Sequence, residues 1–200
     1  MEGGMGMTKR CIVTIGREYG SGGREIGEKL AEKLGISFYD RQFLEMAALE
    51  TGHSEDLLSE QDEIADKKFY PYRTENLSEE LFRIQSRIMI EKAKSESCVI
   101  VGRCSDVVLK DFANVVHIFI YANEEDRIRR VMQRHNLDEV KARKLMKKTE
   151  KIRSSYYQYF TDSDWGNREN KDLLINSSVT GIDQSVDVII AYLKVRGFLD

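Results

Sequence analysis

Residues 11–35 read CIVTIGREYGSGGREIGEKLAEKLG, and this stretch decides the fold. Its first five residues form an apolar run of the kind that is typical of a buried strand. Glycines follow, and they permit positive φ and let backbone amides approach an anion closely. Ile26, Leu30 and Leu34 then have helical spacing, with Gly35 well placed as a C-terminal cap. The stretch therefore predicts a strand, a glycine loop and a helix whose positive end favours phosphate.

The glycine loop departs from the Walker A pattern, Gly-x-x-x-x-Gly-Lys-Ser/Thr. Five residues separate Gly16 from Gly22, and Gly23 and Arg24 stand at the Lys and Ser/Thr places. Arg24 is the first candidate for the missing positive charge and Arg17 is a second, because Arg makes bidentate phosphate contacts. The residues expected to contact phosphate are Gly16, Arg17, Gly20, Ser21, Gly22, Gly23, Arg24 and Glu25. Ser21 is also the candidate hydroxyl for magnesium, and a turn that only joins strand to helix is the alternative interpretation.

Four more apolar runs follow and alternate with helical patterns; they cover residues 36–39, 98–101, 115–121 and 173–176. Strands separated by helices imply right-handed crossovers, so we expect a three-layer α/β/α fold around a five-stranded parallel sheet. Ligands bind such sheets beyond the carboxyl ends of the strands. The loops near residues 16–23, 40–41, 102–106 and 176–181 should therefore form the site.

The predicted organisation is a flexible leader at residues 1–10 and a single domain at 11–200. Within the domain, a helical substrate-side insertion is expected at about 51–78, which contains the only proline, Pro71. A basic, lid-like segment is expected at about 127–168. No apolar run is long enough to cross a bilayer, so no membrane contact is expected.

The overall charge argues against a nucleic-acid binder, because 31 Lys and Arg are balanced by 34 Asp and Glu. The three cysteines have no metal-type spacing, and their odd number does not suggest a disulfide framework. Cys11 and Cys98 lie in apolar runs where buried thiols are common. A reducing, cytoplasmic location is therefore expected, and the oligomeric state is left open.

Four motifs occur in order along the chain: TIGREYGSGGREIGEKLAEKLGISFYDR at 14–41, VIVGRCSDVVL at 99–109, HIFIYANEEDRIRRVMQR at 117–134 and LLINSSVTGIDQSVDVI at 173–189. Together they make the sequence resemble the cytidylate kinase-like family of P-loop nucleoside-monophosphate kinases. The resemblance covers most of residues 14–190 and implies the P-loop kinase type of fold. It also implies ATP at the first and last of these loops and a nucleoside monophosphate opposite. Asn176, Ser177, Ser178 and Gly181 are similar to the family's loop for the ATP base.

Candidate acceptor residues follow the second and third strands. Arg41 and Arg103 lie just past strand ends, where they could reach a phosphate, although surface ion pairs are the alternative. Gly102 and Arg103 match the first two residues of a Gly-Arg-Asp run in cytidylate kinases, while Cys104 replaces the aspartate and Asp106 lies nearby. The expected substrate-binding residues are Asp40, Arg41, Arg103 and Asp106. For Asp40, a helix N-cap and a metal-water contact are equally open.

Arg127, Arg130 and Arg134 are spaced three and four residues apart, so they share one face of a predicted helix. Lys148 and Arg153 follow on the next helix, and this basic surface could close over ATP. A solvated helix is the alternative. The residues expected to act in catalysis are Arg24, Arg103, Arg130, Arg134 and Arg153. The aromatic residues at 156–160 have helical placement, which favours packing over base binding.

The resulting hypothesis is ATP-dependent phosphoryl transfer to a nucleoside monophosphate, with CMP or dCMP as first candidates and ATP and Mg²⁺ as cofactors. Such chemistry needs alignment and compensation of negative charge, which the arginines can supply. A kinase of another small metabolite is one alternative, because a fold does not settle a substrate. A catalytically weak nucleotide-binding regulator is the other, because the loop lacks Lys.

Overall fold

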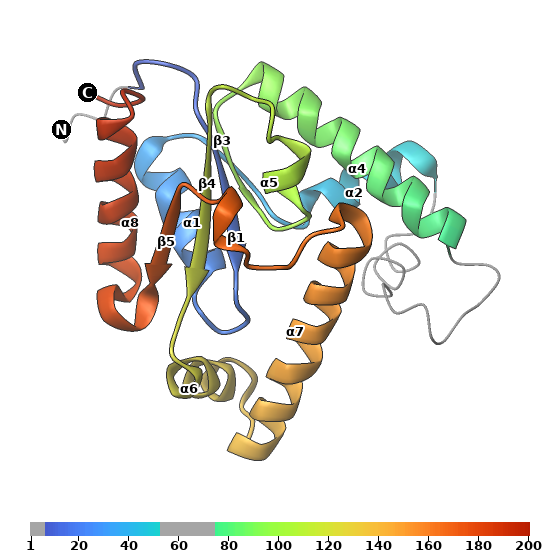
Figure 1. The fold of residues 1–200 in the computed structure, drawn as a ribbon, viewed down its shortest axis with the longest axis vertical. Helices are drawn as coiled ribbons and strands as arrows, with labels where there is room; N and C mark the ends of the chain where they lie inside the picture. Colours follow the sequence, from blue (N-terminus) through green and yellow to red (C-terminus); the bar gives the residue numbers. More distant parts are fainter. Residues whose placement is uncertain (1–6, 53–74) are drawn as a thin grey trace.

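A computed structural model describes residues 7–52 and 75–200. Its five strands are β1 (Ile12–Arg17), β2 (Ser37–Tyr39), β3 (Cys98–Val101), β4 (Val115–Tyr121) and β5 (Leu173–Asn176). They form one parallel sheet in the order β2-β3-β1-β4-β5 (Figure 1). The predicted five-stranded α/β fold is confirmed. β1 runs two residues further than expected, because its pairing with β4 continues through Arg17 opposite Ile120.

The described helices are α1 (Gly23–Leu34), α2 (Gln42–Thr51), α4 (Glu75–Ser95), α5 (Ser105–Val108), α6 (Glu124–His135), α7 (Glu139–Thr161), the 3₁₀ helix η1 (Arg168–Asn170) and α8 (Ser177–Val195). One face of the sheet packs against α1 and α8, and the other packs against α2, α4 and α5. Figure 1 shows α6 beyond the carboxyl ends of the strands, with α7 returning from it toward α4.

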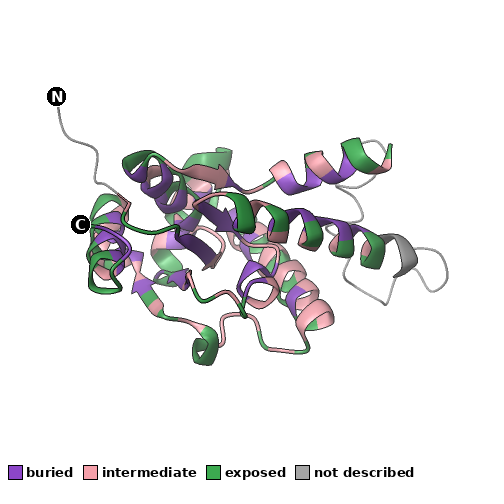
Figure 2. Cartoon of the chain, turned by 90° about the horizontal axis from the view of Figure 1, so that it is seen from above, coloured by how far each residue is buried: buried purple, intermediate pink, exposed green. Residues whose placement is uncertain are grey.

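The core has two halves, one on each face of the sheet, because successive side chains of β1 point to opposite faces and both faces are buried. Val13 and Ile15 face α1 and α8, whereas Ile12 faces α2 and α4. Burying an aliphatic side chain stabilises the fold by about 1.5–3 kcal/mol. Figure 2 shows the buried residues concentrated in the sheet and on the inner sides of the helices. The rigid core thus holds the strand ends, and the loops that follow them, in fixed positions.

The two ends of the described chain lie together. Met7 forms a β-bridge with Leu199, and the backbone N–H of Thr8 donates to the carbonyl of Phe198 at 3.1 Å. Met7 and Thr8 of the expected leader therefore lie against the C-terminal segment, while residues 1–6 lie outside the described part. The substrate-side insertion expected at 51–78 also lies mostly outside it, since α2 ends at Thr51 and α4 begins at Glu75.

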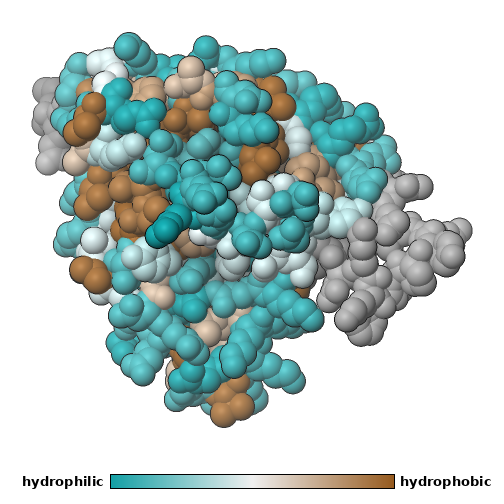
Figure 3. All heavy atoms as spheres, viewed as in Figure 1, coloured by the Kyte–Doolittle hydropathy of each residue, from teal (hydrophilic) through white to brown (hydrophobic). Residues whose placement is uncertain are grey.

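The molecular surface is mostly hydrophilic on the face drawn in Figure 3, with apolar side chains gathered over β5 and α8. Exposed apolar residues there include Leu174 and Val188. Among residues 7–52 and 75–200, no helix has the length and apolar character that a membrane span requires. Cys11, Cys98 and Cys104 are buried free thiols.

Candidate active site

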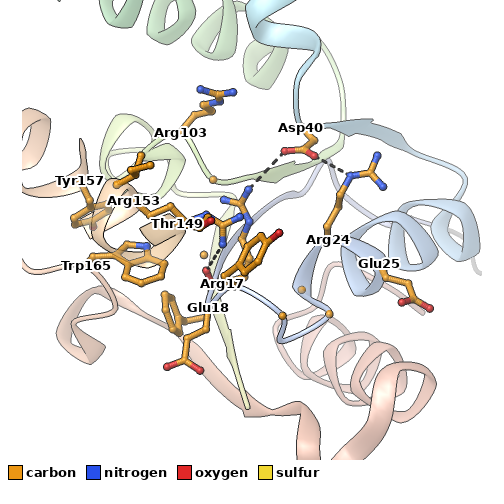
Figure 4. A pocket seen from close by; sticks show the side chains of 18 of the residues that line it. Arg17, Glu18, Arg24, Glu25, Asp40, Arg103, Thr149, Arg153, Tyr157 and Trp165 are labelled. Atoms are coloured by element: carbon orange, nitrogen blue, oxygen red, sulfur yellow. Dashed lines mark hydrogen bonds and ion pairs between the residues drawn. The ribbon is translucent and has the colours of Figure 1, made fainter. Parts of the chain in front are cut away.

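A cleft of about 1260 Å³ opens where the carboxyl ends of the strands meet α6 and α7. The glycine loop, the segments after β2 and β3, and the inner side of α7 line it. Figure 4 shows its centre, where cationic side chains from several of these elements converge. The cleft therefore lies where a parallel α/β sheet places ligands.

The glycine loop is a tight turn between β1 and α1. Ser21 closes it, because both its N–H and its hydroxyl donate to the carbonyl of Glu18. Gly20 and Gly22 have φ of 83° and 81°, which side chains other than glycine rarely adopt. Gly22 is the N-cap of α1 and no side chain caps the helix. The first amides of α1 therefore face the cleft without an internal partner, as an anion site requires.

The loop residues differ in what their side chains do. Ser21 is buried and its hydroxyl is already used in the turn, so it is not directed at a metal ion. Glu25 is exposed on the first turn of α1. Gly16 lies against Phe119 of β4, where a Cβ would come within 2.7 Å of the ring. The phosphate contacts expected from these residues stay predictions.

Asp40 lies between two arginines, one residue before the N-cap of α2. Nε of Arg24 donates to its Oδ2 at 2.9 Å, and Nη2 of Arg17 lies 3.7 Å from its Oδ1 (Figure 4). Arg41 occupies the N-cap position of α2, so the N-cap interpretation of Asp40 is wrong. Arg41 lines the cleft at its outer side. Asp40 thus orients arginines of the glycine loop.

Three arginines carry positive charge into the interior of the cleft. Burial lowers the pKa of Arg17 to about 9, and it also lowers the pKa values of Arg103 and Arg153. Mutual repulsion adds to this, because Arg153 and Arg103 both act on Arg17. Arg103 follows β3 with a left-handed φ of 58°, a conformation that is uncommon outside glycine. An anion bound between these groups would offset the desolvation cost of the three cations and reduce their mutual repulsion.

The predicted lid face divides into two parts. Arg127 is buried, where it pairs with Glu150 of α7 and lies 3.4 Å from Glu18 of the glycine loop. Arg130 donates to the carbonyl of Gly20 at 3.2 Å. Arg130, Arg134 and Lys148 line the cleft, as expected for a basic cover. Arg127 instead ties α6 and α7 to the glycine loop.

Tyr19 adds a further link between the glycine loop and helices α6 and α7. Its hydroxyl hydrogen-bonds Nε2 of His135 on α6 at 2.9 Å, and the guanidinium of Arg153 lies 5.3 Å from its ring centre. Arg153 also donates to the carbonyl of Arg17 at 3.2 Å. Helices α6 and α7 therefore contact four successive residues of the glycine loop, from Arg17 to Gly20.

Asp106 lies on the floor of the cleft in a buried network. Its Oδ2 accepts from the hydroxyl of Tyr157 at 2.8 Å and from Nζ of Lys171. Burial raises the pKa of Tyr157, which keeps the phenol protonated as a donor. The Asp106 carboxylate thus already accepts hydrogen bonds from two protein donors, and the substrate contact expected for Asp106 stays a prediction. Lys171 had no signal in the sequence, because its partner lies 65 positions away.

The aromatic residues at the end of α7 pack as expected, and Phe82 of α4 stacks on Phe160 with ring centres 4.2 Å apart. Two of them do more, since Tyr156 and Tyr157 also line the cleft. Trp165 lines it beside Phe119, with ring centres 5.9 Å apart. The sequence favoured packing over base binding for residues 156–160, and their helical spacing did not show which of them would line a cleft.

The loop between β5 and α8 touches the glycine loop. The Ser177 hydroxyl donates to the carbonyl of Ser21 at 2.6 Å, and Asn176 caps α8 by accepting from Ser178 N–H. Asn123, which follows β4, donates its N–H to the Ser178 hydroxyl. The first and last loops of the sheet therefore form one connected rim.

The described residues do not offer an evident magnesium site. No group of three His, Cys, Asp or Glu side chains among them could hold a metal ion. Arg24 stands where Walker A loops place a Ser or Thr ligand, and both oxygens of Asp40 face arginines. A bound Mg²⁺ usually keeps several waters and contacts substrate phosphates.

A model of the cytidylate kinase-like family matches residues 12–179. The chain belongs to this family. Family membership identifies a phosphotransferase of the kinase type with a nucleotide-binding P-loop fold. The predicted resemblance is confirmed.

Related proteins agree with this membership. The cytidylate kinase of Pyrobaculum calidifontis is 25% identical over 184 residues, which cover 91% of this chain and 92% of that protein. An uncharacterized protein from Eubacterium ventriosum has a solved structure that matches with a TM-score of 0.73. It is 31% identical, over 92% of this chain and 99% of its own.

More distant structures show the same fold. The shikimate kinase from Acinetobacter baumannii, solved in complex with shikimate, matches with a TM-score of 0.56 and 17% identity. The match covers 95% of this chain and 96% of the kinase. At this identity the likeness concerns the arrangement of strands and helices.

Proposed function

We propose that this chain transfers the γ-phosphoryl group of ATP to the phosphate of a nucleoside monophosphate, with CMP or dCMP as first candidates. The observation that carries the proposal is that the partly buried Arg17, Arg103 and Arg153 all line the cleft beside the glycine loop. Each comes from a different element, so no single surface helix explains the cluster. Phosphoryl transfer needs such a fixed array of positive charge between donor and acceptor.

On the donor side, the uncapped start of α1 would bind the ATP phosphates through Gly22, Gly23 and Arg24. The rim formed by Asn176 and Ser178 would hold the adenine side. Arg130 and Arg134 would cover the phosphates from α6 and exclude water. Mg²⁺ would be held chiefly by the phosphates and water, and it supplies further charge compensation when bound.

On the acceptor side, Arg41 and Arg103 would bind the monophosphate, since both line the cleft past strand ends. A monophosphate bound by these two arginines would lie opposite the ATP phosphates. Holding the two substrates aligned in this way would lower the entropic part of the barrier to transfer. The buried thiols are compatible with the proposed cytoplasmic location.

A coupled assay with ATP, Mg²⁺ and each of CMP, dCMP, UMP, AMP and GMP tests the proposal. We expect turnover with at least one cytidine monophosphate. Arg103→Met should raise the KM for the monophosphate by about tenfold or more, because a charge-assisted contact is worth about 1.5–3 kcal/mol. ATP affinity in calorimetry should stay unchanged in this variant. Absence of turnover with every monophosphate would refute the nucleotide-kinase proposal.

The same assay separates the alternatives. Turnover with a small hydroxyl metabolite such as shikimate, and with no monophosphate, would identify a kinase of another metabolite. ATP binding without any turnover would identify a regulator. The regulator hypothesis is motivated by the absence of Lys at position 23. An enzyme would need another cation in the cleft to supply the missing positive charge, whereas a regulator would not.

A further inference from the structure

We propose that Arg17 takes the place of the missing loop lysine and neutralises the phosphoryl group during its transfer. The inference deepens the proposed function and rests on it. It also distinguishes Arg17 from Arg24, which occupies a Walker A position but has a different environment. The evidence is the path of the Arg17 side chain and the two glycines that make room for it.

The stem of Arg17 crosses the start of α1 at Gly23, the residue that stands at the lysine place. A Cβ on Gly23 would lie 2.5 Å from Cβ of Arg17 and 3.2 Å from its Cγ. Non-bonded carbon atoms prefer about 3.5–4.0 Å, so no side chain fits there while Arg17 keeps its position. Gly23 is therefore the space that the Arg17 stem requires.

The head of Arg17 is accommodated in the same way by Gly102 at the end of β3. A Cβ on Gly102 would lie 2.0 Å from Nη1 of Arg17, and the φ of this glycine is 79°. Gly102 directly precedes Arg103, the expected acceptor residue. The guanidinium therefore spans from the donor loop to the acceptor loop, and Figure 4 shows Arg17 between Arg24 and Arg153.

The backbone of Arg17 is fixed on both sides, which orients the side chain. Arg17 is the last residue of β1, and its backbone pairs with Ile120 of β4. Its carbonyl accepts from Nη1 of Arg153 at 3.2 Å. A charge held by a central strand moves less than one on a loop, and such preorganisation strengthens charge stabilisation in a transition state.

Arg24 has partners that satisfy its charge elsewhere. It donates to Asp40 at 2.9 Å and to Glu28 at 3.1 Å, and its side chain is 44% exposed. The Arg17 side chain is 19% exposed, and its distance of 3.7 Å to Asp40 exceeds a hydrogen bond. Arg17 therefore keeps donors for a phosphate, whereas Arg24 holds Asp40 in position. Of the two candidates for the missing positive charge, we therefore assign the role to Arg17.

The step served by Arg17 is a direct transfer. The bond between the terminal phosphorus of ATP and its bridging oxygen breaks, and ADP leaves with the electron pair. An ionised oxygen of the acceptor phosphate supplies the pair for the new P–O bond, so no proton has to be removed. Arg17 would donate to the oxygens of the transferring group, where negative charge is shared between donor and acceptor.

An exchange of side chains tests the inference. Arg17→Met should lower kcat for the monophosphate that the wild type uses by about 100-fold or more, as loss of one transition-state donor does. Gly23→Lys should be similarly inactive, because the new side chain collides with the Arg17 stem. The double variant Arg17→Gly with Gly23→Lys restores an ordinary lysine loop. It should exceed either single variant at least tenfold.

Controls keep the outcomes distinct. Lys33→Met removes a surface cation that pairs with Asp187, and it should leave kcat unchanged. Circular dichroism checks that each variant is folded. Wild-type kcat in Arg17→Met, or a double variant no better than Gly23→Lys, would overturn the inference.

A binding measurement separates this inference from the proposed function. If the wild type phosphorylates no monophosphate, the proposed function fails, but the ratio of ATP to AMP affinity still reports on Arg17. Arg17→Met should reduce that ratio by about tenfold or more, because a charge-assisted contact to the added phosphates is lost. An unchanged ratio would refute the role of Arg17 irrespective of the acceptor.

Discussion

Arg127 links the glycine loop to α6 and α7, which makes it the most informative site for a stability test. Arg127 is 8% exposed, and its guanidinium pairs with Glu150 and approaches Glu18 at 3.4 Å. Arg127→Met keeps a long side chain but leaves the Glu18 and Glu150 carboxylates without the cation that they share. We expect a clear loss in the free energy of unfolding.

The magnitude follows from the burial of the three groups. Removing one partner of a fully buried ion pair costs about 3–5 kcal/mol. Here the Glu18 and Glu150 side chains are 28% and 24% exposed, so water reaches part of each carboxylate. We therefore expect about 2–3 kcal/mol, which is about 4–12 °C in Tm for a domain of this size.

Urea unfolding and thermal melts of Arg127→Met and Arg129→Met measure the effect. Arg129 is the matched control on the same helix; its side chain is 68% exposed and lies 3.3 Å from Asp126, one turn earlier. Its replacement should cost about 0.5 kcal/mol or less. Adding Glu18→Gln and Glu150→Gln to Arg127→Met should recover at least half of the loss. Equal unfolding free energies for the two single variants would refute the reasoning.

Three further predictions concern other buried features. Lys171→Met leaves the buried Asp106 carboxylate without its ion pair and should cost about 3 kcal/mol in urea unfolding; a loss below that of a surface variant would contradict it. Gly20→Ala places a methyl group 2.7 Å from a backbone carbonyl oxygen of α6 at a φ of +83°. It should destabilise the fold more than Gly35→Ala, whose Cβ meets nothing within 4 Å, and thermal melts compare the two. Burial lowers the pKa of His117 below its ordinary value of 6.5. As the pH falls through 6.5, the unfolded chain therefore takes up a proton that the folded protein does not, and the free energy of unfolding decreases. His117→Gln should flatten this dependence of Tm on pH, and an unchanged profile would contradict the assignment.

The strands were predictable because parallel strands buried on both faces appear as continuous apolar runs. The bounds expected for β3, β4 and β5 agree with the structure. β1 was cut short at residue 15, because Gly16 and Arg17 carry no apolar signal although their backbone still pairs with β4. Backbone pairing of polar residues depends on the neighbouring strand, which local composition does not report.

The position of the site was also predictable, since it follows from where parallel strands end. The partners within it were not. Helical spacing placed Arg127 and Arg130 on one face, but it does not tell how deeply each one is buried, and the two have different roles. Asp40 was expected as a cap or a ligand contact, whereas its pairing with Arg24 depends on the packing of two elements. Such long-range pairs require the tertiary structure.

The space above Gly23 has an evolutionary consequence. A lysine at this position and an arginine at position 17 exclude each other sterically, because they need the same volume. If Gly23→Lys comes first, the new side chain collides with Arg17. If Arg17 is replaced first, the loop loses the cation that Arg17 supplies. Positions 17 and 23 should be inherited as a pair, and the two kinds of loop should be separated by a barrier that single substitutions do not cross.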